Sequence, residues 1–221
     1  MTTLPLSSQL IYLCAAVMLL LSFAMLSQRR VLSLVNLLVM QAGTLCLSTL
    51  LVAHSTGQHE LYVSAGITFA LKVVALPWIL YTLIRRLDVR WETETLINVP
   101  TTMLIGIVLV IFSFGSAQPI SELASTINRN TLGIALAVVM LAFMMMITRK
   151  KALTQVIGFL AMENGLFFAA TSATYGMPMV VELGVALDVL VAMLILGVFF
   201  FQIREQFDSL DLHHLESLKE D

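Results

Sequence analysis

The chain has 221 residues, of which 59% are hydrophobic and only 12% are charged. Since soluble domains have about 45–50% apolar residues and the mean hydropathy here is +0.94, the sequence predicts an integral membrane protein. The net charge of -2, without a basic stretch, argues against nucleic acid as a partner. The cysteines, Cys14 and Cys46, are too few for an iron–sulfur cluster or a zinc site, so we expect the chain to carry no cofactor.

Hydrophobic segments follow one another along almost the whole chain. A spanning helix needs about 20 mostly apolar residues, and the sequence predicts about seven such helices in an all-α, polytopic membrane protein. They cover Leu6–Leu26, Val31–Ala53, Leu61–Ile84, Leu96–Ser116, Thr131–Ile147, Ala152–Ala173 and Met179–Ile203. The connections between them are short, so we expect the lipid bilayer to surround the protein and no loop to form a soluble domain.

The basic residues predict how the chain is oriented. Lys and Arg concentrate in cytoplasmic loops of membrane proteins. They follow the odd-numbered segments, at Arg29, Arg30, Arg85, Arg86, Arg90, Arg149, Lys150, Lys151, Arg204 and Lys219, whereas only Arg129 falls in a loop on the other side. With seven spans, the N-terminus is expected outside and the C-terminus in the cytoplasm. The acidic tail after Arg204 is interpreted as a short amphipathic helix or a docking strip on the cytoplasmic face.

Two parts of the chain resemble each other and suggest an internal repeat. Residues 38–43 (LVMQAG) match 160–165 (LAMENG), and residues 70–73 (ALKV) match 186–189 (ALDV). A single spacer helix between the copies makes the repeat parallel, with two three-helix units facing the same way. The predicted organisation is a first unit over 1–86, a spacer over 87–130, a second unit over 131–204 and a tail over 205–221.

The repeat places polar residues at equivalent depths inside the membrane. Gln41 corresponds to Glu163, and Lys72 corresponds to Asp188. An ionisable residue at the centre of a spanning helix costs about 2.5–3.5 kcal/mol on insertion scales. One interpretation is a proton pathway through Glu163, Asp188 and Lys72, because burial makes the charged forms costly and favours proton exchange. The alternative is an ion pair of Lys72 with Glu163 or Asp188 that only locks the helices together.

Neighbouring residues modify this interpretation. Pro77 either kinks the third segment or leaves a free carbonyl close to Lys72. Glu182 is either a proton exit near the outer end of the seventh segment or an interfacial carboxylate, and Asn164 can hydrogen-bond a carboxylate or a partner helix. Gly43 and Gly165 are expected to permit close helix approach.

These residues carry a resemblance to a known family. The strings at 160–165 (LAMENG), 181–188 (VELGVALD) and 210–219 (LDLHHLESLK), together with 69–73 (FALKV) before Pro77, resemble component E of hydrogenase-4, a subunit of formate-hydrogenlyase-type membrane-bound hydrogenases. The second three-helix unit is also similar to the K-type subunit of complex I and to the C subunit of Mrp antiporters.

The resemblance implies a non-catalytic subunit of an oxidoreductase complex in the bacterial or archaeal cytoplasmic (inner) membrane. Its partners would be antiporter-like membrane subunits and a peripheral arm with a NiFe centre and iron–sulfur clusters, and the complex would couple hydrogen chemistry to proton translocation. By motif, Glu163 and Asp188 match the two buried carboxylates of the K-type subunit. The first unit departs from this pattern, since it holds Gln41 and Lys72 at those positions.

Three functions therefore remain open from the sequence. The chain is a subunit that contributes to a proton pathway, a structural anchor without conduction, or a stand-alone secondary transporter. The third is disfavoured because the chain has neither an inverted repeat nor a pair of broken helices facing a midplane site.

Overall fold

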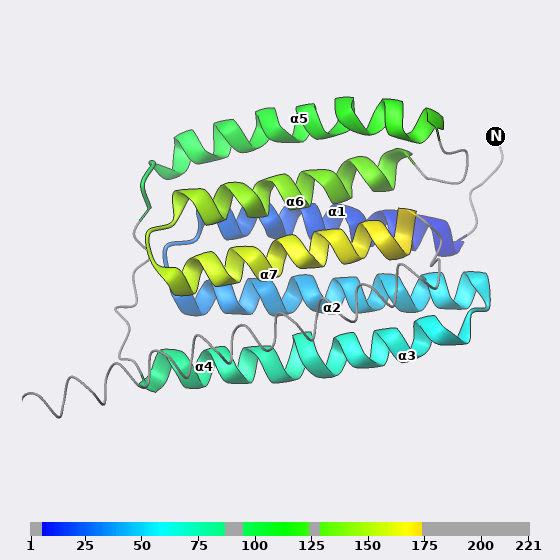
Figure 1. The fold of residues 1–221 in the computed structure, drawn as a ribbon, viewed down its shortest axis with the longest axis horizontal. Coiled ribbons are helices and arrows are strands. Elements are labelled where there is room, and N and C mark those ends of the chain that lie inside the picture. The colour runs from blue at the N-terminus through cyan, green and yellow to red at the C-terminus, as the bar shows by residue number, and fades with distance from the viewer. Residues whose placement is uncertain (1–5, 87–94, 124–128, 174–221) are drawn as a thin grey trace, which may run out of the picture.

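The computed structural model describes residues 6–86, 95–123 and 129–173. The helices run side by side along the long axis of the molecule, and successive spans alternate in direction (Figure 1). The elements are α1 (Leu6–Ser27), α2 (Val31–Thr56), α3 (His59–Thr68), the π-helical segment η1 (Phe69–Ala75), α4 (Leu76–Arg86), α5 (Val99–Leu123), α6 (Arg129–Thr148), α7 (Ala152–Phe168) and the π-helical segment η2 (Ala169–Ala173).

The described residues confirm the all-α membrane architecture. They contain six helical stretches that are long and apolar enough to cross a membrane, and these coincide with the first six predicted segments. The seventh predicted segment, Met179–Ile203, lies outside the described residues. Within those residues the structure contains no strand, and Thr95 and Arg149 form an isolated β-bridge.

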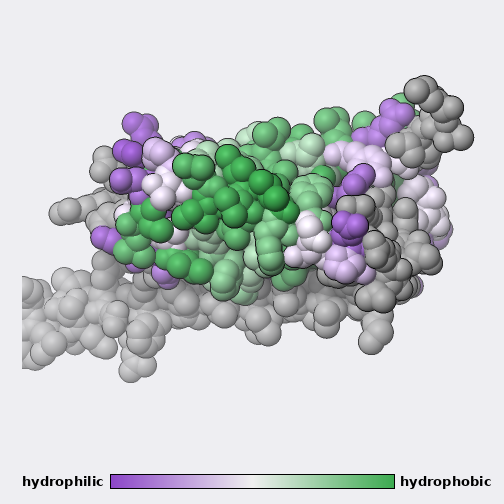
Figure 2. Space-filling model, turned by 90° about the horizontal axis from the view of Figure 1, so that it is seen from above, coloured by the Kyte–Doolittle hydropathy of each residue, from purple (hydrophilic) through white to green (hydrophobic). Residues whose placement is uncertain are grey.

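The distribution of hydrophobic and hydrophilic side chains on the surface of the bundle suits a membrane. On the face shown in Figure 2, hydrophobic side chains form a band with hydrophilic residues at both ends. α5 is the most peripheral span, since only 17% of its apolar window is buried, and Leu104, Ile111 and Phe112 are all largely exposed on it. Such a helix fits a lipid or subunit environment, because isolated soluble proteins rarely expose so large an apolar patch.

The third span is helical throughout but not α-helical throughout. The N–H of Leu76 donates to the carbonyl of Leu71, five residues earlier, and Pro77 follows directly. A proline removes one N–H and its ring crowds the carbonyl of the preceding turn, and π-helical turns are one way in which a helix absorbs such a disturbance. Pro77 was conspicuous in the sequence, but the π-helical segment before it was not predicted.

Most of the described basic residues lie at one end of the bundle, whereas Arg129 begins α6 at the other. The α1–α2 and α6–α7 turns, the end of α4 and the start of α5 all lie at that end, and the α2–α3 turn lies at the other (Figure 1). Arg29, Arg30, Arg85 and Lys150 are exposed there. At the opposite end, Gly57 terminates α2 with a positive φ of 69°, a conformation that glycine adopts without steric cost. The cytoplasmic location of the basic end stays a prediction.

One basic residue at this end is buried. Arg149 is 1% exposed, and its Nη2 lies 3.1, 3.2 and 2.8 Å from the carbonyl oxygens of Met25, Leu26 and Gln28. The last carbonyls of a helix lack intrahelical donors and carry the negative end of its dipole. Arg149 therefore caps the C-terminal end of α1 from the end of α6. Burial lowers the pKa of its guanidinium from the usual value.

The hydrophobic core lies where α1, α2, α4, α6 and α7 meet. Its buried residues include Leu34, Leu80, Leu141 and Ile157, none of which is more than 1% exposed. Since lipid is as apolar as these side chains, the helices associate mainly through close packing and polar contacts.

Close packing is clearest where α7 crosses α6 at Gly165. A Cβ atom on Gly165 would lie 2.9 Å from Cγ1 of Val138 and 3.2 Å from the backbone nitrogen of Val139. The expectation of a close approach is therefore confirmed for Gly165. At Gly43 a Cβ would meet no atom of the described residues within 4 Å, so this part of the chain shows no close helix approach there.

Gly165→Ala should consequently destabilise the bundle by about 1–3 kcal/mol, the usual cost of overpacking, because the added methyl group meets backbone as well as side chains. Gly43→Ala is the matched control and should be neutral or slightly stabilising, since alanine favours the helix. Both effects can be measured from the amount of folded, tagged protein that survives heating in detergent. Equal melting of the two variants would contradict the close α6–α7 contact.

The two hairpins of the proposed repeat run in the same sense. α1 and α6 point one way along the bundle and α2 and α7 the other (Figure 1), with α1 packed on α6 and α2 packed on α7. The third helix of the second unit falls outside the described residues. The division into two three-helix units thus stays a prediction.

Candidate functional site

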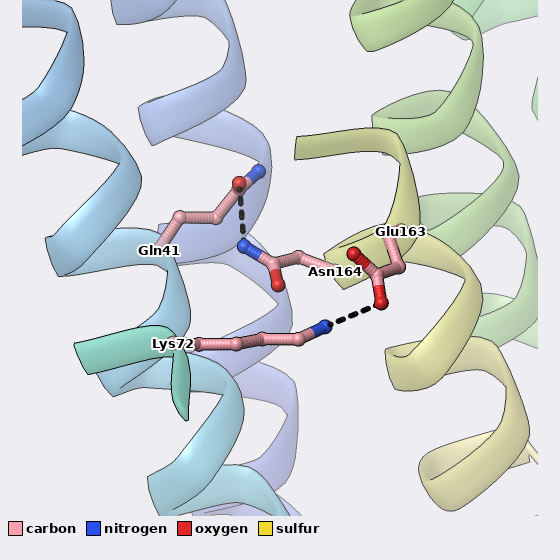
Figure 3. A network of polar contacts seen from close by, with 4 residues as sticks. All are labelled: Gln41, Lys72, Glu163 and Asn164. Carbon is pink, nitrogen blue, oxygen red and sulfur yellow. Dashed lines mark hydrogen bonds and ion pairs between the residues drawn. The ribbon is translucent and has the colours of Figure 1, made fainter. Parts of the chain in front are cut away.

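The bundle buries an ammonium group near the middle of its third span. Lys72 lies within η1, between α3 and α4, and its side chain is 3% exposed. Lys72 is the one charged residue between positions 61 and 84, and the span carries this charge inside the protein and not toward lipid. The side chain extends from η1 toward α7 (Figure 3).

The partner that the structure gives Lys72 is Glu163 of α7. Oε1 of Glu163 lies 3.4 Å from Nζ of Lys72, and the glutamate side chain is 1% exposed. The same Nζ lies 5.5 Å from the centroid of the Phe167 ring, whose face attracts cations. Of the partners left open by the sequence, the described residues therefore place Glu163 in contact with Lys72.

The distance of this contact matters for its chemistry. Charge-assisted hydrogen bonds between nitrogen and a carboxylate oxygen are typically about 2.7–2.9 Å long, and the 3.4 Å separation is longer. The two groups attract each other strongly in a low-dielectric interior, and at this distance the contact is an ion pair longer than a tight charge-assisted hydrogen bond. A small movement of either side chain is enough to change how tightly the pair is bound.

A chain of amide and hydroxyl groups runs beside the ion pair. Nδ2 of Asn164 donates to Oε1 of Gln41 at 3.2 Å (Figure 3), Nε2 of Gln41 donates to Oγ of Ser22 at 3.0 Å, and Ser22 donates to the carbonyl of Met18 at 2.9 Å. The chain links α7, α2 and α1 at the level of the ion pair. Its members are all at most 4% exposed, and such networks rigidify a buried site.

Most residues that the sequence singled out meet at this place. Lys72, Glu163, Gln41 and Asn164 form one buried cluster from three spans (Figure 3). Asp188 and Glu182 lie outside the described residues. Phe167, one turn after Glu163 on the same helix face, was not predicted, and its position four residues from a buried charge is the signal that could have identified it.

Comparison with known proteins identifies relatives that match most of the chain. It is 32% identical over 189 residues to the uncharacterized protein Rv0085 of Mycobacterium tuberculosis, a match that covers 85% of this chain and 86% of that protein. The chain belongs to the Rv0085 family. It is also 23% identical over 161 residues to hydrogenase-4 component E of Escherichia coli and of Shigella flexneri, covering 73% of this chain and 74% of those proteins. No model of a protein family matches, and no solved structure does either.

For this member of the Rv0085 family, the similarity to hydrogenase-4 component E agrees with the resemblance noted in the sequence. The matches extend over most of each relative's length, so the likeness concerns most of the membrane protein and not an isolated helix. In the part of the chain that the structure describes, no three His, Cys, Asp or Glu side chains lie close enough to hold a metal ion.

Proposed function

We propose that this chain is a membrane subunit of a hydrogenase-type complex and that its Lys72–Glu163 pair forms part of a proton pathway. The observation that carries the proposal is the buried ion pair, with Nζ and Oε1 at 3.4 Å and both groups inside spanning helices. The similarity to hydrogenase-4 component E supports the hydrogenase-type complex. Asp188, by its motif, would continue the pathway on the seventh segment.

The physical argument starts from the cost of burying charge. Each ion of a buried pair loses several kcal/mol of hydration, and their attraction offsets this loss only partly. Transfer of one proton from the ammonium to the carboxylate leaves two neutral groups that need far less solvation. The charged and neutral forms of the pair are therefore closer in energy inside the bundle than in water, which is what a proton-conducting site requires.

In this proposal the chain performs no redox chemistry by itself. Antiporter-like membrane subunits would lie beside it in the cytoplasmic (inner) membrane, with the basic end and the C-terminus in the cytoplasm. A peripheral arm with the NiFe centre and the iron–sulfur clusters would supply the driving reaction.

Purification of the tagged chain from its native membranes in mild detergent tests this assembly. We expect large antiporter-like subunits and a NiFe protein to co-purify. Recovery of the chain alone would contradict membership of a hydrogenase-type complex.

Glu163→Gln tests the proton pathway directly. The amide keeps an acceptor within reach of Nζ but cannot take up a proton, so proton translocation by the complex should be abolished while hydrogen oxidation with an artificial dye continues. Translocation is followed in inside-out vesicles with a pH-sensitive fluorophore, and dye reduction in the same vesicles. Glu60→Gln is the matched control, because Glu60 is an exposed carboxylate at the start of α3, and it should change neither measurement.

A structural anchor is the second candidate, and the same ion pair favours it, because the pair ties η1 to α7. Under this function Glu163→Gln would lower the amount of assembled complex and the dye activity together. Full assembly with unchanged proton translocation would contradict the proposed pathway.

A further inference from the structure

Two buried hydroxyl groups lie on the same helix face as Lys72. Ser64 is 2% exposed and Thr68 is fully buried, and they precede Lys72 by eight and four residues. Residues four apart lie above one another on a helix. Ser64, Thr68 and Lys72 thus form a buried polar stripe along the third span, which leads from the ion pair toward the α2–α3 turn.

These two hydroxyls differ from other buried hydroxyls of the bundle. Those of Ser22, Thr49, Thr148 and Thr171 each donate to the carbonyl four residues earlier in their own helix. Oγ of Ser64 and Oγ1 of Thr68 have no hydrogen-bond partner among the described residues. A buried hydroxyl without a partner costs about 1–3 kcal/mol. Since neither hydroxyl bonds to the carbonyl four residues earlier in its helix, a bound water molecule is the simplest partner for each.

The cluster around the ion pair contains a third buried oxygen that lacks a hydrogen-bond partner among the described residues. It is Oδ1 of Asn164, whose side chain is 1% exposed. In Figure 3 this oxygen points to the side on which the Lys72 side chain lies. The buried stripe and the cluster around the ion pair therefore both contain oxygen atoms that can bind water inside the bundle.

We propose that Ser64 and Thr68 bind a short file of internal water molecules, which extends from Lys72 toward the α2–α3 turn. One helical turn separates the two hydroxyls by about 6 Å along the axis. Two hydrogen bonds of about 2.8 Å each span that distance, so one water molecule fits between them. Buried water typically makes about three hydrogen bonds to polar groups that protein atoms leave unsatisfied.

Apolar residues close the end of the water file that lies toward the α2–α3 turn. Leu61, on the same face before Ser64, is 1% exposed and packs with Val52 and Ala53 in an apolar cluster. The bound water is thus separated from solvent at the α2–α3 turn and in contact with the ion pair at the other end. That the file carries protons to Lys72 rests on the proposed function, whereas the binding of water does not.

Radiolytic labelling tests for the water without needing solvent access. X-ray pulses convert water, including bound water, into hydroxyl radicals that oxidise thiols beside it. Ser64→Cys and Thr49→Cys are compared within the intact complex, after Cys14→Ala and Cys46→Ala. Thr49 is equally buried, but its hydroxyl is bonded to Leu45. We expect the thiol at position 64 to oxidise several-fold faster than the thiol at position 49, and Thr68→Val to remove most of the difference.

Equal oxidation rates at the two positions would overturn the water file. This outcome differs from a failure of the proposed function, which is measured by proton translocation in Glu163→Gln. Fast labelling at position 64 with unimpaired translocation in Glu163→Gln would support the water and refute the pathway.

Discussion

Lys72→Met should cost the assembled protein about 3 kcal/mol of stability, the low end of what is measured when one partner of a buried ion pair is removed. Methionine fills similar space, so the loss comes from the charge and not from a cavity. It leaves the Glu163 carboxylate 1% exposed without the cation that the structure places beside it. The effect is measured as a lower temperature at which the fluorescently tagged complex loses its size-exclusion peak.

The double variant Lys72→Met with Glu163→Gln separates the ion pair from general disturbance of the site. With both charges removed, no charge is buried, and stability should return to within about 1 kcal/mol of the original, since replacement of buried ion pairs by neutral groups is often nearly neutral. Proton translocation should stay abolished in the double variant. A double variant as unstable as Lys72→Met would contradict the contact between the two residues.

Arg149→Met should destabilise the protein by about 3 kcal/mol, because hydrogen bonds from a charged group contribute roughly 1.5–3 kcal/mol each and several are lost together. The carbonyls of Met25, Leu26 and Gln28 would lose the donor that caps α1. The melting temperature of the tagged complex again measures the change.

Lys150→Met is the control for this prediction, since it removes an exposed positive charge next in the chain. It should change stability by no more than about 0.5 kcal/mol, as surface substitutions usually do. Similar losses for Arg149→Met and Lys150→Met would show that charge at the basic end matters and that the buried cap does not.

Hydropathy predicted the described spans well because each is a continuous apolar run with polar turns between. The start of α2 at Val31 was predicted to the residue, since Arg29 and Arg30 interrupt the apolar pattern. α5 extends to Leu123, beyond the predicted end at Ser116, and contains Pro119. A proline close to the end of a helix removes few hydrogen bonds, so composition alone placed this boundary too early.

The site was predictable in its members but not in its contacts. Glu163 and Lys72 were conspicuous as charges in apolar segments, yet which of them meet depends on how helices distant in sequence pack. The bond between Gln41 and Asn164 joins positions 123 residues apart, which no local pattern encodes. The sequence placed Arg149 only among the basic residues of a predicted cytoplasmic loop, because a sequence shows the number of basic residues at a helix end but not which one folds back.

The π-helical segment Phe69–Ala75 changes the direction in which the residues of α4 face relative to those of α3. A π-helical turn accommodates one residue more than an α-helical turn, and each residue rotates a helix by about 100°. If the same residues formed a regular α-helix throughout, α4 would turn by about that angle relative to Ser64 and Thr68. Leu80, now fully buried, would leave the core, and Trp78, now 71% exposed, would turn toward it. The extra residue therefore lets a single helix present its polar stripe and its apolar core residues in the directions that each requires.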